Sequence, residues 1–112
     1  MAVELALTPK VLVLNPAEVR DYLASHPDMV ELVERVCDDA VVRFGARGQV
    51  LLELYCDPEI DDEYLTVLVR QARYEKGLLQ EFRELMAAHD AEVSRCSGWL
   101  IITTDFRPPV QA

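Results

Sequence analysis

The sequence predicts one α+β domain with the element order ααββαβ, in which helices cover one face of a three- or four-stranded sheet. Three observations lead to this prediction. The chain has 112 residues, which is close to the commonest size of a domain with a single core. Its apolar residues recur at helical spacing in three segments and follow a strand-like pattern in three others. Proline, glycine and aspartate residues separate these segments.

Two helices are predicted in the N-terminal half. The first covers Pro16 to Ala24, because Asn15 is a favourable cap and proline suits the first helical position. The second follows Pro27 and ends near Gly45. Its apolar stripe consists of Met29, Val33, Val36, Ala40 and Phe44. Charged residues occupy the opposite face, so this helix should pack along one side only.

An antiparallel hairpin is predicted to follow these helices. Its strands, Gln49 to Cys56 and Glu63 to Gln71, each set one row of side chains against another with the two-residue period of a strand. The connecting segment, Asp57 to Asp62, contains a proline and aspartates, which favour a loop.

A third helix, Glu75 to Ser94, and a last strand, Trp99 to Phe106, complete the predicted domain. A connection through a helix leaves the last strand parallel to the second strand of the hairpin. If the last strand lies beside the first strand of the hairpin, every contact in the sheet is antiparallel and the helices share one face. The segment Val3 to Leu14 is a further candidate for an edge strand.

The charge distribution restricts the kinds of partner. The formal net charge is -9, and nearly all the acidic excess lies in residues 1–69. Such a field repels a phosphate backbone, because nucleic-acid binding depends on protein cations that displace counterions. We therefore expect no nucleic-acid partner, whereas a basic protein would be attracted. The apolar runs are too short to span a membrane, and an acid stands where a secretory signal carries basic residues. These features predict a cytoplasmic protein without a membrane segment.

No catalytic, cofactor-binding or metal-binding residue is predicted from motifs. The three cysteines, Cys37, Cys56 and Cys96, are widely spaced and lack a C-x-x-C pair, so we expect reduced thiols. Cys37 and Cys56 are expected to act as small hydrophobic residues. His89 lies on the apolar stripe of the third helix and is expected to bond a neighbour in a structural role. His26 precedes a proline at a helix start, which capping or simple exposure explains.

Two stretches of the chain resemble a known family. The segment Asp57 to Thr66, together with Ser97 to Leu100 and Thr103 to Arg107, is similar to a family of small, acidic, uncharacterised bacterial proteins. The resemblance covers about Val50 to Pro108. It implies no established activity, cofactor or catalytic residue, and it suggests a place in small two-gene units of the toxin and antitoxin kind.

The sequence favours a non-enzymatic interaction module that binds a basic protein, as an antitoxin or an accessory subunit would. Recognition is expected to involve the turn acids Asp57, Glu59, Asp61 and Asp62, with Tyr55, Tyr64 and Arg70 as anchors on the sheet face away from the helices. A homodimer is also predicted, because that face would leave an uncovered patch. The patch consists of Leu51, Tyr55, Tyr64, Thr66 and Leu68.

The alternative is a small metal-dependent hydrolase or nuclease. In that case a divalent ion would be held by Asp57, Asp61, Asp62 and Glu63. The turn lacks the glycine and the terminal glutamate of a calcium-binding loop. A solvated loop is therefore the preferred interpretation of these acids.

Overall fold

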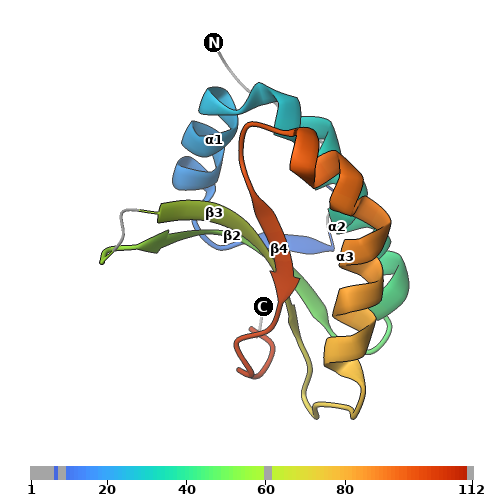
Figure 1. The fold of residues 1–112 in the computed structure, drawn as a ribbon. Helices are drawn as coiled ribbons and strands as arrows, with labels where there is room; N and C mark the ends of the chain where they lie inside the picture. Colours follow the sequence, from blue (N-terminus) through green and yellow to red (C-terminus); the bar gives the residue numbers. More distant parts are fainter. Residues whose placement is uncertain (1–6, 8–9, 60–61, 111–112) are drawn as a thin grey trace.

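The computed structural model describes residues 7, 10–59 and 62–110. In these residues three α-helices, one 3-10 helix and four strands form an α+β domain, as predicted (Figure 1). The elements in chain order are β1 (Val11–Val13), α1 (Pro16–Ser25), η1 (Pro27–Met29), α2 (Val30–Phe44), β2 (Gln49–Asp57), β3 (Asp62–Arg70), α3 (Leu78–Arg95) and β4 (Leu100–Thr103).

The predicted order ααββαβ is wrong because strand β1 precedes the helices. Part of the candidate segment Val3 to Leu14 does form this edge strand, whereas residues 1–6 and 8–9 lie outside the described residues. Asn15 also has a different role from the expected one. Its side chain does not cap α1. It bonds instead to both backbone groups of Leu54, at 3.0 Å each, and so extends the β1–β2 ladder beyond the strand.

The sheet is mixed, with the strand order β1-β2-β3-β4. The hairpin β2–β3 is antiparallel, and β4 is parallel to β3, as the helical connection predicted. The arrangement in which β4 lies beside β2 and all contacts are antiparallel is wrong. Strand β1 pairs in parallel with β2 and occupies that edge, which leaves the free edge of β3 for β4.

The start of α3 is set by a glycine. The helix was expected to begin at Glu75, but it begins at Leu78. Gly77 has a φ of 84°, in the left-handed region that other residues rarely adopt. The chain therefore turns at Gly77 and enters the helix one residue later.

The main hydrophobic core lies between the helices and one face of the sheet. Phe44 and Leu23 are fully buried there, and the rings of Phe44 and Phe82 meet edge to face at 5.3 Å between centroids. The buried strand residues of this face are Val11, Val50, Leu52, Leu54, Leu65, Val67, Val69, Leu100 and Ile102. The helices therefore share one side of the sheet, as the sequence predicted.

The opposite face of the sheet, here called the open face, is partly covered by the chain itself. Of the expected uncovered patch, Leu51, Thr66 and Leu68 are buried. The reason is the segment Thr104–Val110, here called the C-terminal strap, which follows β4 and lies over one end of this face. Asp105 bonds Arg70, and the backbone of Val110 makes two hydrogen bonds to the Gln49 side chain.

Candidate functional site

The predicted anchors Tyr55, Tyr64 and Arg70 lie along one face of the hairpin strands, and the described turn acids lie at the hairpin end of the same strands. Tyr55 and Tyr64 lie opposite each other on the hairpin, with ring centroids 5.1 Å apart. Asp62 begins β3 close by, at the same end of the sheet. Asp57 accepts a hydrogen bond of 2.9 Å from the backbone of Glu59, which closes the start of the turn. Asp61 lies outside the described residues.

Arg70 lies farther along the same face of β3 as Tyr64 and lines one groove with it, and its role as an anchor stays a prediction. Its side chain is only 8% exposed and pairs with the Asp105 carboxylate through two bonds, of 3.1 and 2.6 Å. These bonds raise the pKa of the guanidinium and lower the pKa of the Asp105 carboxyl. Arg70 therefore fixes the C-terminal strap on the sheet.

A first candidate site is a groove of about 310 Å³ on the open face, here called the sheet groove. Tyr55 and Tyr64 line one part of it, Ile101 provides apolar surface, and the buried Leu68 also lines it. Thr66 also lines the groove and is only 4% exposed, yet its hydroxyl has no hydrogen-bond partner. Buried polar groups are normally bonded. The hydroxyl oxygen itself has almost no exposed surface, so it is not an accessible donor or acceptor of the groove.

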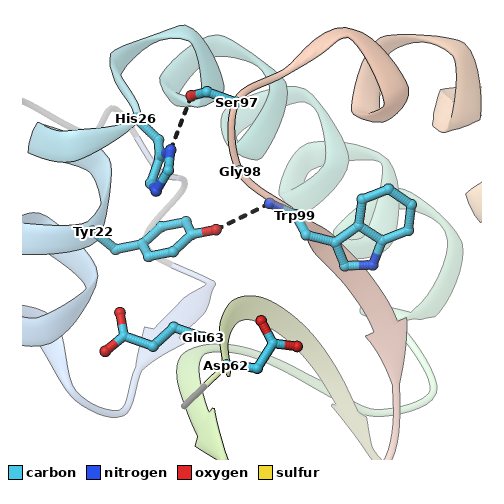
Figure 2. Close-up of a pocket in the computed structure, with 7 residues that line it drawn as sticks. All are labelled: Tyr22, His26, Asp62, Glu63, Ser97, Gly98 and Trp99. Atoms are coloured by element: carbon cyan, nitrogen blue, oxygen red, sulfur yellow. Dashed lines mark hydrogen bonds between the residues drawn. The ribbon is translucent and has the colours of Figure 1, made fainter. Parts of the chain in front are cut away.

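A second candidate site, here called the acidic hollow, has a volume of about 570 Å³ and lies between α1, the start of β3 and the start of β4 (Figure 2). It is lined by Tyr22, His26, Asp62, Glu63, Ser97, Gly98 and Trp99. Figure 2 shows the Glu63 carboxylate on the α1 side of the hollow, near Tyr22, and the Asp62 carboxylate on the Trp99 side.

Close packing at Gly98 shapes one wall of the acidic hollow. A Cβ at this position would lie 2.3 Å from the sulfur of Met29 and 2.6 Å from the hydroxyl of Tyr22. The absence of a side chain lets the backbone amide of Trp99 donate a 3.0 Å hydrogen bond to that hydroxyl. The bond orients the phenol ring of Tyr22 at the edge of the hollow.

His26 and Ser97 lie together but do not form a nucleophile with its base. The Ser97 hydroxyl donates to Asp28 at 2.8 Å, and the Ser97 amide donates to the other oxygen of the same carboxylate at 2.8 Å. These two bonds lower the pKa of Asp28. Nδ1 of His26 lies 2.9 Å from the same Ser97 oxygen. The hydroxyl proton of Ser97 is engaged in the hydrogen bond to Asp28. Nδ1 must then act as the donor, so it cannot activate the serine.

A smaller hollow of about 310 Å³ adjoins the acidic hollow and shares Tyr22, His26 and Glu63 with it. Glu18 and Asp21 add two more carboxylates, and no lysine or arginine lines either hollow. Burial is the main cause that raises the pKa of Tyr22, and the charges of Glu63, Asp62 and Asp28 raise it further. The electrostatic potential at the phenol is therefore negative.

Several acids elsewhere on the described surface are paired with arginines. Arg47 pairs with Glu75 at 3.3 Å and with Glu81 at 3.0 Å, and Arg35 pairs with Glu92. The pKa of Glu81 is lowered, mainly by its hydrogen bond to Arg47. The two hollows differ from these regions because none of the ion pairs found within residues 10–59 and 62–110 involves their carboxylates.

The cysteine and histidine predictions have mixed outcomes. All three cysteines are free thiols. Cys37 is fully buried, and burial raises the pKa of its thiol to about 12. Cys56, expected on an apolar face, is exposed because it lies where β2 extends toward the turn. His89 is buried and its Nε2 lies 2.7 Å from Asp39, which confirms the structural role.

In the part of the chain that the structure describes, no group of three or more histidine, cysteine, aspartate or glutamate residues could hold a metal ion. No observation on the described residues therefore favours the metal-dependent hydrolase. Nor does any described helix have the length and apolar character needed to cross a membrane.

Comparisons of the chain with protein families, curated proteins and solved structures found no match. The site must therefore be interpreted from its own geometry. No role was predicted for Tyr22, His26 was explained by capping or exposure, and Trp99 was only the expected start of the last strand. The one feature of the sequence that could have linked Tyr22, His26 and Trp99 was the polar and aromatic character of three segments that are far apart along the chain.

Proposed function

We propose that the protein is a non-enzymatic interaction domain that binds a basic protein partner on the open face of its sheet, as an accessory subunit or an antitoxin would. The sheet groove carries this proposal. It combines the Tyr55–Tyr64 pair with the apolar side chain of Ile101. Tyrosines are frequent anchors of protein interfaces because they offer a large apolar ring and a polar tip.

The charge of the molecule supports a basic partner over a second copy of the same chain. The net charge is -9, so two copies repel each other, whereas a basic protein is attracted over a long range. The homodimer inferred from the sequence has also lost part of its apolar surface, because Leu51 and Leu68 are buried. Light scattering at micromolar concentration distinguishes the two possible partners of the open face. The mass of a dimer would indicate that a second copy of the chain binds there, and the mass of one chain would favour a different protein.

Site-specific photo-cross-linking in the source cell tests the proposed function. With the benzophenone amino acid at position 55 in place of tyrosine, we expect one dominant cross-linked product that contains a basic protein. The matched control places the same group at Val42, which is 86% exposed and belongs to α2. Binding of the identified partner to purified protein should weaken as salt screens the charges.

A second variant separates anchoring from attraction. Tyr64→Ala should mainly increase the dissociation rate of that partner, because it removes a ring from the sheet groove. Equal cross-linking at positions 55 and 42, or an acidic partner whose binding does not depend on salt, would rule out the proposed function.

A further inference from the structure

We infer that the acidic hollow is a binding site for the guanidinium group of an arginine that belongs to a peptide chain. The inference deepens the proposed function, and it rests on that function only for the source of the arginine. The hollow and the sheet groove adjoin, because Asp62 lines the first, Tyr64 lines the second, and both side chains project from the same face of β3.

The carboxylates of the hollow lack a cation of their own. Asp62 and Glu63 reach the hollow from consecutive positions of β3, and neither makes an ion pair with a described residue. Glu18 and Asp21 add negative charge from α1 through the adjoining hollow. A guanidinium is planar and offers five N–H donors, so it can bond one carboxylate through two of them and offer the others to further acceptors of the hollow.

Aromatic rings provide the second half of a site for a delocalised cation. Trp99 is 46% exposed although it is large and apolar, and it lines the hollow together with Tyr22 (Figure 2). Guanidinium groups bind to the faces of tryptophan and tyrosine rings, with the largest gain where water is partly excluded. The exposed indole and the unpaired carboxylates therefore point to the same class of ligand.

The hydrogen-bonding capacity left in the hollow indicates that this cation is part of a peptide. Tyr22 is only 7% exposed, and its hydroxyl accepts the Trp99 amide. The proton of that hydroxyl has no acceptor among the described residues, so it is available to a carbonyl oxygen of a ligand. In the tautomer that carries its proton on Nδ1 and donates to Ser97, Nε2 of His26 is an acceptor for an N–H group. An arginine within a peptide supplies both the carbonyl and the N–H groups.

Tryptophan fluorescence gives a direct test, because Trp99 is the single tryptophan of the chain. The probe is arginine capped as N-acetyl-arginine N-methylamide, and its matched control is the citrulline analogue, in which a neutral urea replaces the guanidinium. We expect a saturable change of Trp99 emission with the arginine probe. The citrulline analogue should bind about tenfold more weakly or less, which corresponds to about 1.4 kcal/mol. Higher salt should weaken only the arginine probe.

Three variants of the full chain assign the contacts. Asp62→Asn and Glu63→Gln should each weaken binding of the arginine probe several-fold, whereas Glu59→Gln, in the same turn but outside both hollows, should leave it unchanged. Tyr22→Phe should remove the advantage of the capped arginine over methylguanidine, which has the cation but no carbonyl. Thermal melting of each variant checks that it is folded.

The outcomes separate this inference from the proposed function. Equal binding of the arginine and citrulline probes, or no effect of Asp62→Asn and Glu63→Gln in folded protein, would overturn the arginine site. Methylguanidine that binds as tightly as the capped arginine would overturn its assignment to a peptide. A specific arginine site without any cross-linked partner at position 55 would refute the proposed function and leave the arginine site standing.

Discussion

Replacing Phe44 by alanine should lower the free energy of unfolding by about 3–5 kcal/mol, the usual cost of removing a fully buried aromatic ring. Phe44 has no exposed surface, ends α2, and packs against the ring of Phe82 from α3. It therefore joins two helices above the sheet. Because domains of this size have about 5–15 kcal/mol of stability, the loss is a large fraction of the total.

Urea denaturation followed by circular dichroism measures this loss. Leu79→Ala is the matched control, since it removes an apolar side chain that is 49% exposed on α3. We expect this control to change the free energy of unfolding by less than about 0.5 kcal/mol. Similar effects of the two substitutions would show that Phe44 does not hold the helices together.

Replacing Asp105 by alanine should cost about 2–4 kcal/mol, because it leaves the guanidinium of Arg70 buried without its partner. The lower part of this range is expected, since the Asp105 side chain is itself 29% exposed. The substitution also removes a bond that holds the C-terminal strap on the open face. Asp90→Ala, at an exposed position of α3, should change stability by less than about 0.5 kcal/mol.

The pH dependence of the stability lost in Asp105→Ala shows whether that loss is electrostatic in origin. The pKa of Asp105 is lowered, first by its hydrogen bond from Arg70. Its stabilisation is therefore fully present above the pKa of about 3.9 in the unfolded chain, and it is lost as the pH falls through the lower folded value. The stability difference between wild type and Asp105→Ala should stay constant from pH 7 to about pH 5 and shrink below about pH 4. A difference that persists at low pH would indicate lost packing.

Elements with local signals could be predicted from the sequence. The alternation of residues in β2 and β3, and the aspartates and proline between them, located the hairpin to within a residue or two and placed Tyr55 near Tyr64. The apolar stripe of α2 was equally clear. Strand β1 has only three residues and pairs with a distant partner, so no period identifies it. The order of the outer strands likewise depends on which edge is already occupied.

The candidate site was predicted only in part, for a similar reason. Asp62 and the tyrosines were identified because acids and aromatic residues recur in one hairpin. The acidic hollow also needs Tyr22 and His26 from the end of α1 and Trp99 from the start of β4, and only the tertiary fold brings these segments together. Strand alternation gave the face on which Arg70 lies but could not show that Arg70 pairs with Asp105 of the C-terminal strap.

The pairing pattern of the sheet has a consequence for how the molecule opens. Only β2 and β3 are neighbours along the chain, whereas the outer pairings join distant residues, such as Val11 with Val50 and Leu65 with Leu100. Distant pairings carry a larger loop-closure cost and form later during folding. In native-state hydrogen exchange, β2 and β3 amides should open only with global unfolding, and β4 amides through smaller fluctuations; uniform protection would contradict this. Molecules with β4 detached expose the edge of β3, so aggregation from the native state should begin at that edge.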